Sequence, residues 1–300
     1  MKNQLKLTRN SAIGYILILL GLLFISLPLA SRTVNDYKAK ASEEEFVKEQ
    51  IQRSSEEVAT ETENAKEYNE VVKNSDVTVS DPFTAEDYQT KYEKFTKTNV
   101  PFAYLSIPKI DKNLPLYLDA TLEHLSNGVA HVDGTSIPIG GAGTRSVIAG
   151  HRGWWTDTML LYVDQLQEGD YVYIQRAEET MRYVVRDKEV IGPYDWDKLA
   201  PRGDADIITL LTCSPFIPPR PNRLLVNCYR DESGIAEEFN LPGAKLPASE
   251  SENSDNALTD KMVVRTRIIT LVLAILTIVL FVITLIKFIS RIKNTRKIKN

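Results

Sequence analysis

Two long apolar runs stand near the ends of the chain. Residues 11–30 and 268–286 contain no charged side chain, and each run is long enough to cross the hydrocarbon core of a membrane as a helix. We therefore predict transmembrane helices at 11–30 and 263–289. The first run follows basic residues and ends in small ones, so a cleaved signal peptide is the alternative, although the run is longer than the about 7 to 15 apolar residues usual there.

Between about residues 100 and 230 the pattern changes to short β-type runs that are separated by turn signals. These runs are 103–107, 114–117, 146–149, 171–174, 182–190, 207–212 and 224–229. Apolar and polar residues alternate most regularly at 170–174, directly after the turn at Gly169. The series of short runs predicts an all-β domain, either an antiparallel sandwich or a barrel.

Stretches of different composition flank this domain. Residues 36–76 are acidic and free of Pro and Gly, with apolar positions at roughly helical spacing, which predicts a solvated helical stalk. An extended piece with an Asp-Pro turn and a helix at 84–97 are predicted next. The predicted organisation is an N-terminal tail (1–10), a transmembrane helix (11–30), an acidic helical stalk (31–76), an extended segment with a connector helix (77–99), the β-domain (100–238), a flexible tether (239–262), a second transmembrane helix (263–289) and a basic tail (290–300).

The distribution of charge indicates the orientation and excludes one class of partner. Basic residues crowd the two extreme termini, so both tails are predicted to be cytoplasmic and residues 31–261 extracytoplasmic. Basic residues in the terminal tails outnumber those on the inner side of the apolar runs. The tails contain Lys2, Lys6, Arg9, Arg291, Lys293, Arg296, Lys297 and Lys299, and the inner side contains Arg32, Lys261, Arg265 and Arg267. The net charge of -4 argues against nucleic-acid binding. A length of 300 residues suits one catalytic core.

A cysteine ends the apolar run at 207–212. Four prolines within the eight residues after Cys213 must break the strand and stiffen the connection. The next run begins at Arg223, so the two strands can pair as a hairpin that brings the guanidinium beside the sulfur. A thiol with a reference pKa of about 8.5 is mostly protonated at neutral pH, and an adjacent cation lowers that pKa. Arg223 could activate the thiol or bind the oxyanion of a tetrahedral intermediate, and the sequence does not choose between these roles.

A thiol nucleophile needs a proton shuttle, and the chain has only three histidines. His151 directly follows the apolar run 146–149 and lies between two glycines, so a strand end delivers it to a loop where a ligand can approach. His124 lies in a predicted helix and His131 precedes a turn. We interpret both as surface or locally hydrogen-bonded residues.

The second cysteine, Cys228, lies within a strand, where a small apolar side chain packs. A disulfide with Cys213 is the minor alternative, because it would consume the exposed sulfur. The glycine-rich run at 140–143 lacks the Lys-Ser/Thr of a phosphate-binding loop. Nothing in the sequence resembles a metal site, and no cofactor is required.

Three motifs together resemble the sortase family, and within it the pilus-building class C. The run LLTCSP at 210–215, with Arg223 after it, resembles the family's TLxTC nucleophile strand and trailing arginine. The run GHRG at 150–153 resembles the family's histidine loop, and GTSIPIGG at 134–141 is similar to the GTSLPxGG stretch of the pilus class. The similarity covers about residues 101–230.

This resemblance implies an eight-stranded sortase-type β-barrel with short helices, an N-terminal helical lid region and flanking transmembrane helices. It also implies cleavage of an LPXTG-like sorting signal between Thr and Gly. Cys213 would attack the threonine carbonyl, His151 would protonate the departing amine, and Arg223 would orient the substrate and stabilise the charge. A lysine of the next pilin would then attack the thioester and form an isopeptide bond. The implied partners are pilins or surface proteins with such signals at the Gram-positive cell surface, and membrane lipid.

The tripeptide at 81–83 resembles the Asp-Pro-aromatic lid of the pilus class. By that resemblance Asp81 would pair with Arg223, and Phe83 would cover Cys213. A plain Asp-Pro turn before a helix is the alternative. The sequence departs from the family where two tryptophans follow the histidine loop, a place where Leu-Pro is frequent, and both this segment and the proline-rich loop would border the substrate groove.

Three other functions remain open. The chain could be a sortase that attaches surface proteins to peptidoglycan, which uses a cell-wall amine in place of a pilin lysine. It could be a non-catalytic, membrane-anchored β-barrel that binds a partner, in which case Cys213 would not be selectively reactive. A general cysteine protease is the weakest alternative, because no motif positions an Asn or Asp to orient His151.

Overall fold

The computed structural model describes residues 8–74, 79, 81–83, 100–154, 157–176, 179–231 and 261–297. The chain divides into two compact units, and the larger one consists of Lys38–Trp154 and Thr158–Val263. The connector helix predicted at 84–97 and the tether predicted from residue 239 onward lie outside the described residues, except for the last two tether positions.

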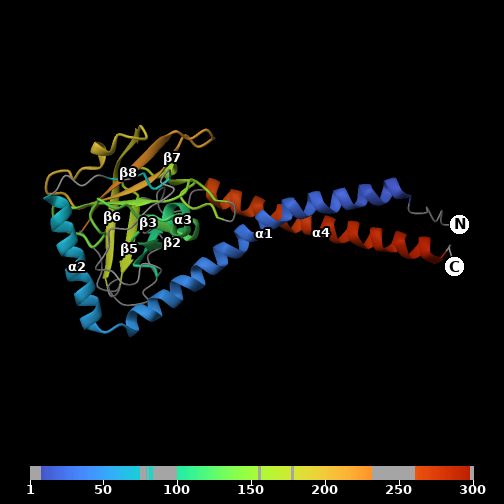
Figure 1. Ribbon diagram of the computed structural model, residues 1–300, viewed down its shortest axis with the longest axis horizontal. Helices are drawn as coiled ribbons and strands as arrows, with labels where there is room; N and C mark the ends of the chain where they lie inside the picture. Colours follow the sequence, from blue (N-terminus) through green and yellow to red (C-terminus); the bar gives the residue numbers. More distant parts are fainter. Residues whose placement is uncertain are drawn as a thin grey trace. The chain divides into compact units, whose positions relative to one another are not determined.

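Eight strands within the described residues close into a barrel in the order β1-β2-β3-β4-β7-β8-β6-β5 (Figure 1). They are β1 (Ala103–Ile107), β2 (Lys112–Tyr117), β3 (Val129–His131), β4 (Arg145–Ala149), β5 (Tyr171–Arg176), β6 (Glu179–Ile191), β7 (Ile207–Ser214) and β8 (Asn222–Arg230). The short helices between them are η1 (Pro108–Ile110), α3 (Leu122–Asn127), η2 (Val163–Gln165) and η3 (Trp196–Leu199). The prediction of an eight-stranded β-barrel with short helices is confirmed.

Two of the described strand pairs are parallel, whereas the run pattern predicts an antiparallel sheet. β2 pairs in parallel with β3, and β4 pairs in parallel with β7. Parallel neighbours need a long crossover connection, and between β4 and β7 the chain supplies one through β5 and β6. The run pattern also misses β3, because three residues are too few to show alternation.

The two faces of the strands bury different clusters. The main apolar core contains side chains from all eight strands, so it fills the barrel interior. A second apolar cluster, here called the outer cluster, takes side chains from the opposite face of β3, β4, β7, β8 and the end of β6. Its members are Ala120, Leu125, Ala130, Val132, Val147, Ala149, Ile191, Leu199, Leu211 and Leu225. Val79, Phe83, Tyr117 and Trp196 pack against it.

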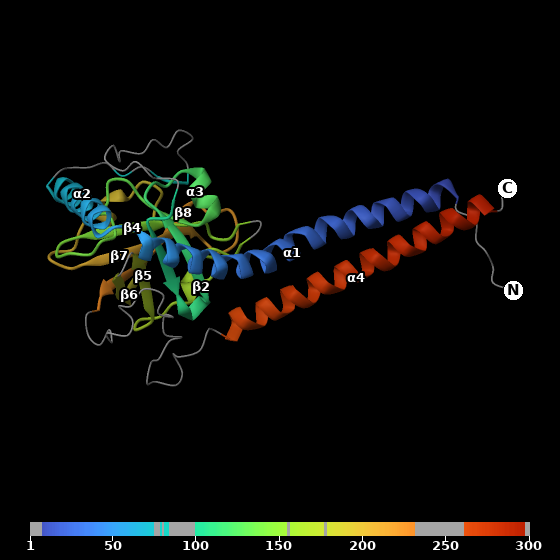
Figure 2. The same cartoon turned by 90° about the horizontal axis from the view of Figure 1, so that it is seen from below.

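A helix from the predicted stalk packs on the barrel. α2 (Ser55–Lys73) begins after the N-cap Ser54, whose hydroxyl accepts from the backbone N–H of Glu57. Its buried Asn69 donates to the carbonyl of Ile137 at 3.1 Å and accepts from the N–H of Ile137 at 2.6 Å. Figure 2 shows α2 lying against the barrel. The acidic stretch is therefore helical here but only partly solvated, since one side of α2 carries the barrel contacts.

Helices at the two ends of the chain are long and apolar enough to cross a membrane. They are α1 (Arg9–Gln52) and α4 (Lys261–Lys297), and their apolar spans are Arg9–Asn35 and Val263–Thr295. Most of the large apolar side chains in these spans are exposed, which is unfavourable in water and favourable in a bilayer. The expectation of flanking apolar helices that could span a membrane is thus confirmed.

Candidate active site

Adjacent strands place the sulfur beside the guanidinium. β7 and β8 pair in antiparallel register with Cys213 opposite Arg223, which confirms the predicted hairpin. Cys213 is half-buried and free, and Arg223 is 4% exposed. Opposed residues of an antiparallel pair have neighbouring side chains, so a cation lies next to the thiol.

The parallel pairing of β4 with β7 carries the histidine to the same place. Ala149 pairs with Leu211, and beyond the strand the N–H of Gly150 donates to the carbonyl of Leu211 at 3.0 Å. The Thr212 hydroxyl donates to the carbonyl of Gly150 at 2.7 Å, so the register continues. Two residues past Ala149 and Leu211 stand His151 and Cys213, and alternation puts both side chains on the outer face.

Gly150 leaves room for two apolar side chains that pack against the end of β4. A Cβ atom at this position would lie 2.8 Å from side-chain atoms of both Leu160 and Val129. Real Cβ atoms do not come so close to other carbon atoms, so a larger residue would push β4 away from its neighbours. The glycine before His151 therefore serves packing, beyond loop flexibility.

Two aromatic rings hold the imidazole of His151. The Trp154 ring stacks on it with centroids 4.4 Å apart, and the Phe83 ring lies 5.7 Å away on a tilt of 47°. Among the described residues His151 Nε2 is buried without a hydrogen-bond partner. Ring packing therefore orients this histidine, and Nε2 is available for a proton. In the sequence the tryptophan pair stands out only as a departure from the family, and no local pattern predicts this contact.

The lid segment, residues 81–83, lies over the same side chains. The Asp81 carboxylate accepts a 2.5 Å bond from Arg223 Nη2, and the backbone N–H of Phe83 donates to Asp81 Oδ1 at 3.0 Å. The Arg223 guanidinium carbon is 5.3 Å from the centroid of the Phe83 ring. The structure thus brings all five predicted site residues together, Cys213, His151, Arg223, Asp81 and Phe83.

Burial keeps both the thiol and the imidazole neutral in this arrangement. It raises the pKa of Cys213, an effect that Arg223 opposes and Asp81 reinforces. Burial also lowers the pKa of His151. The expected lowering of the thiol pKa by Arg223 is present but smaller than the effect of burial. Both shifts favour the uncharged thiol and imidazole in the closed site.

This protonation state predicts the pH dependence of thiol reactivity. Alkylation of Cys213 by iodoacetamide in the full chain should accelerate about tenfold per pH unit above pH 6, because only the thiolate reacts and the raised pKa keeps it scarce. The rate should reach no plateau below about pH 8.5, the ordinary thiol pKa, because burial raises the pKa of Cys213 above it. Peptide mass spectrometry resolves Cys213 from Cys228. A plateau at neutral pH would contradict the neutral pair.

Arg152 and its partners connect the two loops of the site, and sequence analysis did not single them out. Arg152 Nη1 lies 3.4 Å from the carbonyl oxygen of Cys213, and Arg152 Nη2 forms a 3.0 Å ion pair with Asp164 of η2. Arg220 Nη1 donates to the carbonyl of Arg152 at 2.8 Å. The only available signal was the position of Arg152 directly after the histidine. These contacts fix the strand end that carries the nucleophile.

The remaining candidates have structural roles. Cys228 is fully buried in the barrel interior, and burial raises the pKa of its thiol well above the ordinary value. His124 is buried and bonds Asp119 through Nδ1, and His131 is fully buried against Leu118 and Thr135. The interpretation of both as locally hydrogen-bonded holds, but neither is at the surface. No group of three or more metal-ligating side chains occurs in the part of the chain that the structure describes.

His131 makes stability depend on pH. Burial lowers its pKa to about 4 in the folded protein, whereas the unfolded chain has about 6.5, so the unfolded state binds more protons between these values. Stability is therefore lost as pH falls through this window, by about 2 to 3 kcal/mol at pH 4.5 relative to pH 8. Denaturant unfolding of His131→Gln should show a smaller pH dependence over the window than the parent. An equal dependence in both proteins would contradict this role.

The comparisons with known proteins concern this same region. The family model of the sortase domain matches residues 105–231. Sortase A of Bacillus anthracis is 28% identical over 109 residues, 36% of this chain and 50% of that protein, so the match spans half the length of this relative. Sortase C-3 from Streptococcus pneumoniae is 37% identical with a TM-score of 0.59, covering 65% of this chain and 90% of that one. Sortase C1 of GBS Pilus Island 1 is 29% identical with a TM-score of 0.58, covering 64% of this chain and 98% of that one.

The matched residues include His151, Cys213 and Arg223 and nearly the whole barrel. The structural relatives are class C sortases, and each is covered almost entirely. The chain belongs to the sortase family of cysteine transpeptidases.

Proposed function

We propose that this chain cleaves LPXTG-like sorting signals between Thr and Gly and joins pilin subunits through a lysine isopeptide bond. The convergence of Cys213, His151 and Arg223 at one strand end carries this proposal. The pilus assignment rests on the lid contacts of Asp81 and on the kinship with class C sortases, one of them from a pilus island.

The geometry suits acyl transfer through a thioester. Cys213 Sγ attacks the threonine carbonyl carbon while its proton passes to His151 Nε2, which is buried and otherwise unbonded. Arg223 donates N–H groups to the oxygen that becomes negative. Collapse of this intermediate breaks the Thr-Gly bond, and His151 gives the proton to the departing glycine amine. A lysine amine then attacks the thioester, His151 takes the amine proton, and the proton passes on to the departing sulfur, which restores the Cys213 thiol and the neutral imidazole.

Ladder formation tests the proposal. The full chain in detergent, carrying Asp81→Ala and Phe83→Ala to open the lid, is incubated with a pilin subunit that has an LPXTG-type signal. We expect covalent ladders on a denaturing gel and a thioester adduct on Cys213 by mass spectrometry. Cys213→Ala should abolish both products, and Cys228→Ala should retain them. Absence of adduct and ladder from the lid-open chain would contradict the proposal.

A competition experiment separates pilus assembly from the alternative, attachment of surface proteins to peptidoglycan. The lid-open chain receives a sorting peptide together with the pilin and a cell-wall peptide amine at equal concentration. We expect the pilin lysine to capture most of the acyl group. Preferential transfer to the cell-wall amine would favour the alternative, and an unreactive Cys213 would favour a non-catalytic binding module.

We further propose that α1 and α4 anchor the protein in membrane lipid with both termini in the cytoplasm and the barrel outside. The apolar spans and the basic residues beyond them support this orientation. Protease added to intact cells should digest the barrel and leave an epitope tag at either terminus protected. Digestion of either tag in intact cells would contradict the orientation.

A further inference from the structure

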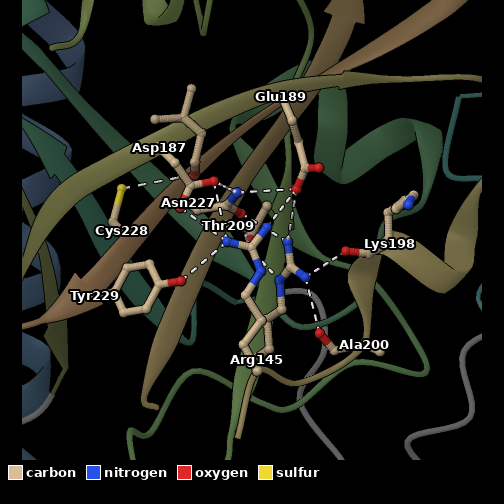
Figure 3. Close-up of polar contacts among 11 residues, drawn as sticks. Arg145, Asp187, Glu189, Lys198, Ala200, Thr209, Asn227, Cys228 and Tyr229 are labelled. Atoms are coloured by element: carbon tan, nitrogen blue, oxygen red, sulfur yellow. Dashed lines mark hydrogen bonds and ion pairs between the residues drawn. The ribbon is translucent and has the colours of Figure 1, made fainter. Parts of the chain in front are cut away.

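The outer face of the barrel carries a group of polar side chains that the proposed reaction does not use. This polar ladder crosses four adjacent strands, β4, β7, β8 and β6, in that order. Its members are Arg145, Thr209, Asn227, Asp187 and Glu189 (Figure 3). Thr209 pairs directly with Asn227, and Asn227 with Asp187, so the side chains are cross-strand neighbours.

The polar ladder, the outer cluster and the catalytic residues follow one another along the strands on this one face. On β4 the residues that face outward are Arg145, Val147 and Ala149, followed by His151 past the strand end. On β7 the same alternation gives Thr209, Leu211 and Cys213. The apolar layer between the polar ladder and the reactive groups is the surface against which Val79 and the lid residue Phe83 pack.

The guanidinium of Arg145 reaches out of the sheet to the η3 loop, residues 192–206 between β6 and β7. Arg145 Nη1 donates to the carbonyl oxygen of Lys198 at 2.5 Å and to that of Ala200 at 3.0 Å (Figure 3). The last carbonyls of a helix have no partner within the helix, and η3 ends at Leu199. A cationic side chain is a suitable cap for such carbonyls.

These two bonds flank the residue of the loop that enters the outer cluster. Leu199 is 3% exposed and packs with the cluster members of β4, β7 and β8, and Trp196 of the same helix packs beside it. Fixing the carbonyls of Lys198 and Ala200 therefore fixes Leu199. Leu199 thus belongs to the same outer cluster against which Val79 and Phe83 pack.

The rest of the guanidinium is bonded as well. Nε donates to Thr209 Oγ1 at 3.0 Å and Nη2 to Asn227 Oδ1 at 2.8 Å, with Glu189 3.8 Å away. Arg145 is 1% exposed, and burial, with the nearby charge of Arg202, lowers its pKa to about 10, which leaves it charged at neutral pH. A buried charge is costly unless its donors are satisfied, and lysine could not reach these acceptors from several directions at once.

We propose that Arg145 is a positioning residue that holds the η3 loop as the wall of the substrate surface. In the lid-open protein the apolar part of the sorting signal occupies the layer that Val79 and Phe83 leave, and Leu199 borders it. Arg145 acts on substrate binding through this loop, and it contacts neither the thiol nor the imidazole. This inference rests on the proposed function for the identity of the ligand, but not for the anchoring of the loop.

The test compares Arg145→Gln and Arg145→Lys with the parent, all as full chains in detergent with the lid opened by Asp81→Ala and Phe83→Ala. For Arg145→Gln we expect KM for a sorting peptide to rise about tenfold with kcat within about threefold, because the wall is lost while the reactive groups stay in place. Iodoacetamide should alkylate Cys213 at the parent rate within about twofold. Arg145→Lys should recover part of the KM loss, since its ammonium can still bond one carbonyl.

Hydrogen exchange provides a readout that does not depend on activity. Backbone amides of residues 192–206 should exchange about tenfold faster in Arg145→Gln, while those of β4 and β7 remain protected. Arg176→Gln is the matched control, because Arg176 is a buried arginine of β5 that bonds Glu61 and Thr62 of α2. It should lower thermal stability without changing exchange in the η3 loop or KM.

Each outcome decides a different point. Unchanged exchange in the η3 loop of Arg145→Gln would overturn the anchoring role, and so would a loss of protection throughout the barrel in both Arg145 variants. Faster exchange with an unchanged KM would overturn the role in substrate binding. If the lid-open parent itself processes no sorting peptide, the proposed function fails, whereas the exchange measurement still decides whether Arg145 fixes the loop.

Discussion

Arg223→Lys is expected to lower kcat/KM for sorting-peptide cleavage by about 10²- to 10³-fold, the usual loss when a donor to a developing oxyanion is removed. Arg223 Nη1 lies 3.1 Å from the carbonyl of Asn222 and 3.3 Å from that of Pro221, while Nη2 points to the carboxylate of Asp81. One nitrogen is thus anchored on the protein and the other is presented to an anionic oxygen. In the proposed mechanism this nitrogen would instead donate to the oxyanion of acyl transfer once the Asp81 carboxylate has left.

A lysine cannot reproduce that arrangement, because its single nitrogen cannot be anchored and presented in two directions at once. The measurement is single-turnover formation of the thioester in the lid-open full chain. Arg182→Lys is the control, because Arg182 of β6 pairs with Asp231, which follows β8, away from the thiol. The rate of this variant should stay within about twofold of the parent. A drop of less than about threefold for Arg223→Lys would show that a point charge suffices.

The site could be predicted from sequence to the extent that each reactive residue is marked locally. Cys213 lies near the end of β7, His151 two residues past the end of β4, and Arg223 near the start of β8, so the sequence predicts their placement at strand ends. The sequence does not predict that the three side chains converge. Their convergence depends on the parallel pairing of β4 with β7, two strands separated by the whole of β5 and β6, and no local pattern specifies that partner.

The effect of burial on the Cys213 pKa could not be predicted from the sequence for the same reason. A neighbouring arginine is visible in the sequence, but the burial that outweighs it in setting the Cys213 pKa depends on the folded arrangement of the chain. The sequence does not predict the packing of α2 either, because this mostly acidic helix docks through a few dispersed side chains: Ala65, Tyr68 and Asn69, and the bonds of Glu61 and Thr62 to Arg176. Arg145 gave no signal either, since a single arginine at the start of an apolar strand is read as a strand boundary.

Opening the lid is expected to make Cys213 more reactive. Asp81→Ala combined with Phe83→Ala should accelerate alkylation of Cys213 at pH 7 by about 10- to 100-fold, because the lid loses its ion pair with Arg223 and the apolar burial of one aromatic ring. The control is Glu70→Ala combined with Val71→Ala, which removes an exposed acidic and an exposed apolar side chain from α2 and should not change the rate. An unchanged rate in the lid variant would contradict the closed position of residues 81–83.

The pH dependence of Cys213 alkylation in the same double variant shows whether the lid only blocks access to the sulfur or also raises the pKa of the thiol. Burial raises the pKa of the Cys213 thiol and Asp81 reinforces this effect, whereas Arg223 lowers the pKa. Removing both lid side chains leaves the lowering effect of Arg223 unopposed by Asp81, so the pKa falls and the alkylation profile moves to lower pH. A lid that only covered the sulfur would raise the rate equally at every pH, because access does not depend on protonation. A shift of the profile would instead mean that lid opening also generates the nucleophile, so that the thiolate forms only when the site is free to receive a substrate.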